Sequence, residues 1–240
     1  MTLFFFSNFE IGGAQKIAIN LINKLSEKDK TFKTIITINK SGNLRDTIKK
    51  KIKIHDFKKK RLIYCAFDYL KFINKYNVKK IFCVQPHIAI FCYIVNFFFC
   101  KNIKIIARET NSYKKNLFRK FTIKEQIFIY LKRLVYNNIY HVIYPSKGLK
   151  SEIVGKKTFI RNFVDIKFLK NYKKKNSNYL LGVGRLVEQK RFEDLINAYN
   201  LIHKNINEKL IIIGEGPEKQ NLKNLIKKLK LKKKNKDFTL

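Results

Sequence analysis

Two cationic side chains stand in a short loop that directly follows an apolar run. The loop spans residues 184–190 (GRLVEQK) and comes after YLLGVG, which reads as a buried strand. A guanidinium can form paired hydrogen bonds with phosphate oxygens, and a lysine ammonium adds a second positive charge. We therefore predict that Arg185 and Lys190 bind a diphosphate, with Glu188 in the same loop. The alternative is a solvated basic loop in a basic protein.

Two glycine-containing turns precede expected helices. Residues 8–16 (NFEIGGAQK) contain Gly12 and Gly13, which let the backbone approach a ligand, and a helix N-terminus offers unpaired N–H groups to an anion. Their spacing fits neither the dinucleotide fingerprint nor the P-loop, so a structural tight turn is the alternative. Gly214 and Gly216, with Pro217 after them, follow the run KLIIIG. That turn would contact a nucleotide through backbone atoms, or serve as a turn alone.

Three further polar residues follow predicted strands. Arg108 and Glu109 come after KIIA, where they could contact sugar hydroxyls, transfer a proton, or pair with each other. We take Glu109 as the candidate catalytic carboxylate and Arg108 as a possible substrate contact. His87 follows IFCVQP and could bind substrate or cap a helix. The alternative for all three is a purely structural role.

The cysteines predict neither a metal site nor a redox motif. They stand at positions 65, 83, 92 and 100, without C-x-x-C spacing and without an accompanying histidine cluster. Cys83, Cys92 and Cys100 lie in apolar surroundings and are expected to be small buried hydrophobic residues. This usage suits a reducing compartment, and we expect no metal and no cofactor.

The composition limits the class of protein. The chain has 240 residues, 45% of them hydrophobic and 29% charged, which argues against a protein with many membrane spans. Its net charge of +36 would attract polyanions. Lysine is spread along the whole length, beside abundant Asn, Ile and Phe, as an AT-rich coding sequence favours. We therefore expect no specific nucleic-acid partner, and an anionic membrane surface suits this coat better.

One segment is long enough to cross a membrane. Residues 81–100 carry no charge, but Gln85, Pro86 and His87 stand where a strand would turn into a helix. We interpret the segment as a buried strand followed by a buried helix, with a transmembrane helix as the alternative. Residues 1–6 are apolar, but they are too short for a secretory signal and lack its charged N-terminal region.

Strand-like and helix-like stretches alternate along the chain. In the first part we expect strands at 3–7, 34–38, 52–56, 79–84, 103–107, 141–144 and 158–160. Helices are expected between them at 14–25, 44–51, 64–76, 88–100, 123–136 and 146–154, the last with Ser146 as its N-cap. Residues 167–178 (KFLKNYKKKNSN) are polar and typical of a linker. Strands at 179–184 and 209–214 then alternate with helices at 192–203 and 218–229.

Such alternation predicts an α/β fold of two Rossmann-like parallel-sheet domains. The expected boundaries are 1–165 for the N-terminal domain, 166–178 for a linker and 179–240 for a partial second domain. Ligands of such sheets bind beyond the carboxyl ends of the strands. The candidate residues above stand in loops of that kind.

Taken in order, these segments resemble family 4 of the glycosyltransferases, which retain anomeric configuration and have the GT-B fold. The resemblance is carried by GGAQK, ARETN, YPSKGLKSEI and IRNFVD, the last similar to Ile-x-Asn-Gly-Val-Asp. VGRLVEQKRFEDLINAY and LIIIGEGPEKQNLKNLIKKLKL follow, and their mutual spacing is the most specific part. Nearly the whole chain is covered.

The resemblance implies a nucleotide-sugar donor, UDP-linked, bound between two lobes. Arg185 and Lys190 match the family residues that hold the donor diphosphate, with Glu188 between them. Gly12 and Gly13 match the loop near the reaction centre. Glu109 stands where many members have a histidine that faces the donor sugar. Phe163 follows Asn162 where the family usually has glycine.

The resemblance also implies an acceptor and a place of action. Members transfer sugars to lipid-linked or other glycan acceptors in capsule, lipopolysaccharide or glycoprotein assembly, which implies a cytoplasmic enzyme at the inner face of the membrane. The sequence lacks the family's Pro-Ser-x-x-Glu-Gly segment and its acidic pair seven residues apart. We therefore expect an incomplete second lobe with two strands and the stub of a third at 237–238, and weak or absent turnover. The alternative is a non-catalytic basic protein that binds nucleic acid or anionic membrane.

Overall fold

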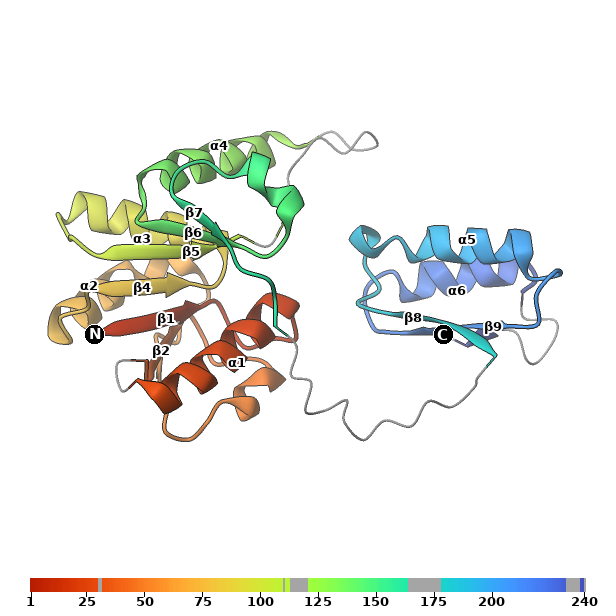
Figure 1. Cartoon of the computed structure of the whole chain (residues 1–240), viewed down its shortest axis with the longest axis horizontal. Coiled ribbons are helices and arrows are strands. Elements are labelled where there is room, and N and C mark those ends of the chain that lie inside the picture. The colour runs from red at the N-terminus through yellow and green to blue at the C-terminus, as the bar shows by residue number, and fades with distance from the viewer. Residues whose placement is uncertain (30–31, 110, 113–120, 164–177, 232–237, 240) are drawn as a thin grey trace. The chain divides into compact units, whose positions relative to one another are not determined.

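A computed structural model describes residues 1–29, 32–109, 111–112, 121–163, 178–231 and 238–239. The chain divides into two compact units, Met1–Asp165 and Ile166–Leu240. The linker expected at 166–178 lies outside the described residues except for Asn178. Each unit is an α/β structure built on a parallel sheet (Figure 1).

The first unit contains a seven-stranded sheet in the order β3-β2-β1-β4-β5-β6-β7. All six neighbouring pairs are parallel. The strands are β1 (Thr2–Phe6), β2 (Thr34–Thr37), β3 (Lys53–Asp56), β4 (Lys80–Cys83), β5 (Lys104–Arg108), β6 (His141–Tyr144) and β7 (Lys157–Phe159). The strand order reverses between β1 and β4, which is the topological switch point of such a sheet.

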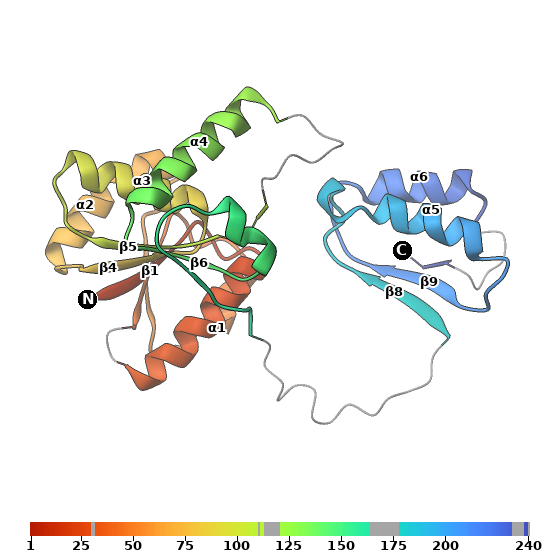
Figure 2. The ribbon, with the colours of Figure 1, turned by 45° about the horizontal axis from the view of Figure 1, so that its top comes forward.

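Helices cover both faces of this sheet, which is why its central strands are apolar throughout. In β1, Phe4 and Phe6 pack with α1 (Gly13–Lys28), whereas Leu3 and Phe5 face the other side. That side is covered by α2 (Ala66–Lys75), α3 (Pro86–Phe98) and α4 (Ile123–Asn138). Figure 2 shows α1 on one side of the sheet and the other three helices opposite.

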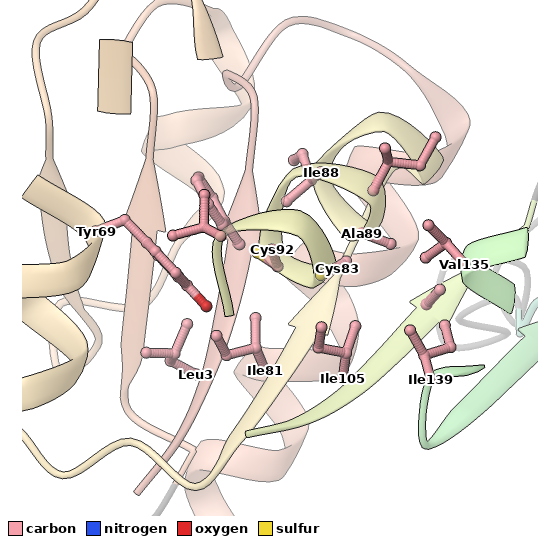
Figure 3. Close-up of a cluster of buried hydrophobic side chains, with 14 of the residues drawn as sticks. Leu3, Tyr69, Ile81, Cys83, Ile88, Ala89, Cys92, Ile105, Val135 and Ile139 are labelled. Atoms are coloured by element: carbon pink, nitrogen blue, oxygen red, sulfur yellow. The ribbon is translucent and has the colours of Figure 1, made fainter. Parts of the chain in front are cut away.

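The larger core lies under α3. Leu3, Ile81 and Ile105 form a row across β1, β4 and β5, and Ile139 continues it after α4 (Figure 3). Ile88, Ala89 and Cys92 of α3 pack onto this row, with Tyr69 of α2 and Val135 of α4 beside them. Residues 81–100 therefore contain a buried strand and a helix packed on the core, as expected, although residues 97–100 at the end of the segment are exposed. None of the described helices combines the length and apolar character that a membrane crossing requires.

Three details of the first unit differ from expectation. The helices expected at 44–51 and 146–154 are only short 3-10 turns, Asn43–Thr47 and Lys147–Glu152, and Ser146 makes no side-chain cap bond. Glycines at 42, 148 and 155 and the extended Ile153 disfavour longer helices there. Cys100 is exposed rather than buried, because α3 ends at Phe98 and Cys100 takes a left-handed conformation with φ 49°.

The second unit has a parallel sheet in the order β10-β9-β8. Its strands are β8 (Tyr179–Val183), β9 (Lys209–Ile213) and β10 (Phe238–Thr239), and α5 (Phe192–Ile202) and α6 (Lys219–Lys228) lie on one face (Figure 1). Leu210 and Ile212 point into the core beneath these helices. On the opposite face Leu181, Val183 and Ile213 are exposed, so the apolar sheet is covered by described residues on one side only.

Candidate functional site

The predicted site residues fall into two groups, one in each unit. In the first unit Gly12 and Gly13 follow β1, His87 follows β4, Arg108 ends β5 and Glu109 comes directly after it. These three strands are neighbours in the sheet, and their parallel direction brings the residues to one carboxyl edge at the switch point. In the second unit Arg185, Glu188, Lys190, Gly214 and Gly216 lie in the loops after β8 and β9.

The loop after β1 is fixed by the loop after β2. The Phe9 N–H donates to the Ser41 carbonyl at 2.7 Å, and the Leu44 N–H donates to the Phe9 carbonyl at 3.0 Å. Gly42 makes this approach possible, because it has φ 110° and a Cβ there would lie 2.1 Å from Phe9 backbone atoms. Sequence reasoning missed Gly42, although a lone glycine after a strand was the available signal.

The glycine pair opens α1 without a side-chain cap. Gly12 is the N-cap residue, with extended backbone, and Gly13 begins the helix. A Cβ on Gly13 would have nothing within 4 Å, whereas one on Gly12 would meet the flexible Gln15 side chain. No packing requirement therefore accounts for glycine at position 13. The open space above it lies at the carboxyl edge, where a ligand of this sheet would bind.

Two polar contacts join β1 and β4 across the switch point. Ser7 Oγ lies 2.8 Å from His87 Nε2, and the Ser7 N–H donates to Gln85 Oε1 at 3.3 Å. His87 belongs to the first turn of α3, caps no helix and is an exposed residue. The protein around the ring removes part of its hydration, which lowers the pKa of His87 below 6.5. Ser7 was missed by the sequence reasoning, though it is the first polar residue after β1.

Arg108 clamps the beginning of α1 to the segment that leaves the unit. Its guanidinium donates to the Ala14 carbonyl at 3.2 Å and to Asn162 Oδ1 at 2.8 Å, and the side chain is buried. Burial lowers the pKa of Arg108 from its ordinary value. Phe163, which follows Asn162, lies under the ammonium group of Lys24, with 5.1 Å between the ring centre and Nζ. Arg108 therefore holds the carboxyl edge together, rather than pairing with Glu109.

Glu109 is buried and engaged by cationic and backbone donors. Lys132 of α4 donates to Glu109 Oε2 at 2.7 Å, and the Asn111 N–H donates to Oε1 at 3.1 Å. The backbone N–H of Glu109 donates to the Ile143 carbonyl at 2.9 Å. The geometry favours a structural role for this carboxylate, and its catalytic assignment stays a prediction.

The two loops of the second unit are bonded into one rigid pair. The Gly184 N–H donates to the Ile213 carbonyl, the Leu186 N–H to the Glu215 carbonyl, and the Glu218 N–H to the Leu186 carbonyl, at 2.9–3.1 Å. A Cβ on Gly214 would lie 1.9 Å from the Gly184 oxygen, and one on Gly216 would lie 2.2 Å from the Leu186 oxygen. Both glycines thus have a packing reason, and Leu186, fully buried, anchors the loop.

Arg185, Glu188 and Lys190 are all exposed on this rigid pair of loops. Arg185 and Lys190 form no ion pair with any residue that the structure describes, so their charges are available to a ligand. Arg191, by contrast, makes a two-pronged contact with Asp194, at 2.7 and 2.9 Å, which raises its pKa. A small hollow of about 40 Å³ lies at the start of α5. Its charged lining residues are Glu188, Glu193, Glu218 and Arg191, and the excess of acidic groups makes it unsuited to a diphosphate. Among the described residues no three His, Cys, Asp or Glu side chains gather as metal ligands.

Comparison with known proteins finds a sequence match over one segment of the chain and a likeness of fold over most of it. Residues 164–236 match the sequence model of the family "Glycosyl transferases group 1". A search of curated protein sequences returned no match. Several solved structures, in contrast, match its fold along nearly the whole chain.

Three solved structures illustrate the likeness. HepE from Anabaena, in complex with UDP-glucose, has a TM-score of 0.75 at 15% identity, over 99% of this chain and 68% of that one. Sucrose-phosphate synthase from Thermosynechococcus elongatus has 0.70 at 12% identity, over 99% and 69%. The lipopolysaccharide outer core galactosyltransferase WaaB, in its apo form, has 0.63 at 16% identity, over 96% and 66%. Identities this low show the fold alone.

The seven-stranded parallel sheet of the first unit and the βα alternation of the second agree with these structures. The expected α/β fold of the GT-B type is therefore confirmed. The chain has the fold of the GT-B glycosyltransferases, and its residues 164–236 match the group 1 family of glycosyl transferases.

Proposed function

We propose that this protein transfers a sugar from a nucleotide-sugar donor, UDP-linked, to a lipid-linked or other glycan acceptor in cell-surface polysaccharide synthesis. We further propose that it belongs to the retaining family 4 and works at the inner face of the cytoplasmic membrane. The observation that carries the proposal is the pair of exposed cations, Arg185 and Lys190, on a rigid loop of a unit that matches the group 1 family. HepE bound to UDP-glucose and the galactosyltransferase WaaB support the donor class.

The chemistry follows from where charge develops. Cleavage of the bond between sugar and diphosphate leaves negative charge on the departing phosphate. Cations already in place stabilise this transition state more than the ground state. The backbone hydrogen bonds between the two loops fix the positions from which the Arg185 and Lys190 side chains extend. These two side chains would perform the charge neutralisation that a bound metal ion supplies in other transferases.

In the first unit, we assign the acceptor side to the switch point. Ser7 and His87 present a hydroxyl and an imidazole that is neutral at pH 7, both able to bond a sugar hydroxyl. The open space at Gly13 would admit the substrate close to the backbone. Arg108, through its hydrogen bond with Asn162, would stabilise the carboxyl edge of the sheet. Glu109 would do the same through its ion pair with Lys132.

Calorimetric titration of the 240-residue protein with UDP tests the proposal. We expect saturable binding that weakens at least about tenfold in Arg185→Ala, since a charge-assisted contact contributes about 1.5–3 kcal/mol. Lys190→Ala should weaken binding less, because an ammonium lacks the paired geometry. Lys223→Ala, which removes an exposed lysine of α6, is the matched control and should bind as the wild type does. Absence of UDP binding, or equal binding by Arg185→Ala, would refute the donor site.

The net charge of +36 supports a second candidate, a non-catalytic protein that binds polyanions. The two functions differ in salt dependence. Binding of duplex DNA that falls steeply with salt, together with no UDP binding, would favour this second function. UDP binding that is lost in Arg185→Ala favours the transferase.

A further inference from the structure

We propose that helix α4 docks the first unit onto an anionic lipid bilayer through a row of exposed apolar side chains. The row, here called the α4 stripe, consists of Ile123, Ile127, Tyr130 and Leu134, with exposed fractions of 76%, 55%, 68% and 42%. This inference extends the proposed action at the membrane. It rests on the proposed function in one respect, namely that docking would bring the protein to a lipid-linked acceptor. The docking itself does not depend on the chemistry of transfer.

The spacing of the stripe makes it a single face of the helix. The intervals of four, three and four residues repeat the helical period, so the four side chains stand above one another. The opposite face is already occupied, because Val135 and Tyr136 are buried in the core and Phe128 packs against it. A helix on a protein surface normally turns its polar face outward. Here both faces are apolar, and the outer one lacks a partner among the described residues.

The charges beside the stripe suit an anionic surface. Lys124 and Arg133 are both exposed on α4. The single acidic residue of the helix, Glu125, is held in a capping box, where its Oε2 accepts from the N–H and the hydroxyl of Thr122. A basic-flanked apolar face is the pattern of helices that lie in the membrane interface, with apolar groups among the acyl chains and cations at the phosphates.

The helix beside α4 adds further exposed aromatic surface. α3 packs along α4 on the same side of the sheet (Figure 2), and it ends in Phe97 and Phe98, both largely exposed, followed by exposed Phe99. Aromatic side chains are favoured at the level of lipid headgroups. A second copy of this chain is a poorer occupant than a bilayer, because two proteins with a net charge of +36 repel each other.

The direction of α4 relates the stripe to the candidate site. Its C-terminal end leads through Ile139 and Tyr140 into the start of β6, at the amino edge of the sheet. Ile123 therefore lies at the end of the helix nearer the carboxyl edge, which carries Ser7 and His87. A bilayer under the stripe would run beside that edge, within reach of an acceptor whose lipid remains in the membrane.

Co-sedimentation with sucrose-loaded vesicles tests the docking surface. The purified chain is mixed with vesicles of phosphatidylcholine, with and without about 30% phosphatidylglycerol, at about 0.15 M salt. We expect binding to the anionic vesicles that falls at least about tenfold in the double variant Ile127→Ser, Tyr130→Ser, because two apolar side chains no longer enter the interface. Leu201→Ser, on the exposed face of α5, is the matched apolar control and should bind like the wild type.

A second pair of variants isolates the charges. Lys124→Gln with Arg133→Gln should weaken binding to anionic vesicles more than Lys223→Gln with Lys227→Gln, which removes the same charge from α6. Equal loss in both pairs, or full binding by the stripe variant, would overturn the proposal. So would a wild-type dimer that the stripe variant converts to a monomer with vesicle binding unchanged. UDP titration of the stripe variant separates the two proposals, since a failed donor site leaves the vesicle result standing.

Discussion

The carboxylate of Glu109 and the ammonium of Lys132 form an ion pair of 2.7 Å in which only 1% and 3% of the side chains are exposed. Glu109 directly follows β5, and Lys132 is one of the buried residues of α4. The pair therefore ties the helix that carries the α4 stripe to the carboxyl edge of the sheet. A buried charge without its partner is strongly unfavourable, whatever the net contribution of the intact pair.

The variant Lys132→Met should lower the free energy of unfolding by about 3–5 kcal/mol, because it leaves the Glu109 carboxylate buried and uncompensated. Urea denaturation followed by circular dichroism measures the change. The matched control is Lys59→Met, which breaks a 3.1 Å pair with Asp68 whose side chains are 39% and 36% exposed. That variant should change stability by about 1 kcal/mol or less. A Lys132→Met protein as stable as Lys59→Met would contradict the prediction.

The four thiols should differ sharply in reactivity, since only Cys100 is exposed. Burial raises the pKa of Cys65 to about 11 and that of Cys83 well above its ordinary value, so little thiolate forms at either. We expect an aromatic disulfide reagent at about pH 8 to label one thiol quickly in the native protein and all four after denaturation. Cys100→Ser should remove the fast reaction. More than one fast thiol in the native wild type would be inconsistent with the packing of α2 and α3.

The order of strands and helices could be predicted because the apolar periods are clear. The strand expected at 141–144 has these bounds in the structure, and the others agree within a few residues. The helix α3 could be recognised inside an uncharged segment because Gln85, Pro86 and His87 interrupt the apolar run where a strand turns into a helix. In the structure Pro86 is already part of the first turn of α3. The wrong predictions of helices at 44–51 and 146–154 and of a buried Cys100 have the same cause. Glycine-rich or left-handed backbone ends a helix locally, and composition alone does not locate that end.

The candidate site was less predictable, because its contacts cross between strands. The sequence shows that Arg108 and Glu109 are adjacent, but their side chains have separate partners, Asn162 and Lys132. Neither partner could be identified without the fold, because Asn162 follows β7, two strands away from β5 in the sheet, and Lys132 lies on α4. Similarly, Ser7 and His87 are eighty positions apart and meet only because β1 and β4 are neighbours. Arg185 and Lys190 were identifiable because one loop contains both.

Two glycines in the same region should respond oppositely to alanine. Gly42→Ala forces a left-handed backbone and a contact with Phe9, and we expect it to lower the free energy of unfolding by about 2–4 kcal/mol. Gly13→Ala adds a methyl group in open space at the first position of a helix, and should leave stability unchanged or raise it by up to about 1 kcal/mol.

Thermal or urea unfolding of both variants measures these effects. If a substrate also approaches Gly13, the Gly13→Ala protein should be stable yet weaker in transfer, a combination that a purely structural turn would not produce. A Gly13→Ala variant destabilised as much as Gly42→Ala would show that position 13 is packed after all.

The neutral form of His87 should make stability depend on pH below neutrality. Its pKa is lowered in the native state, so between about pH 6.5 and that lower pKa the unfolded chain binds more protons than the folded one. The stabilising contribution is therefore fully present above about pH 6.5 and declines as the pH falls below it. Urea denaturation from about pH 8 to pH 5 should show a decline in the free energy of unfolding that is smaller in His87→Gln, where the titrating ring is absent.

Nuclear magnetic resonance of the histidine ring protons gives the pKa of His87 directly, with His87→Gln as the assignment control. A value at or above 6.5, or an unchanged pH slope in His87→Gln, would mean that the ring at the switch point is not shielded from water by its neighbours.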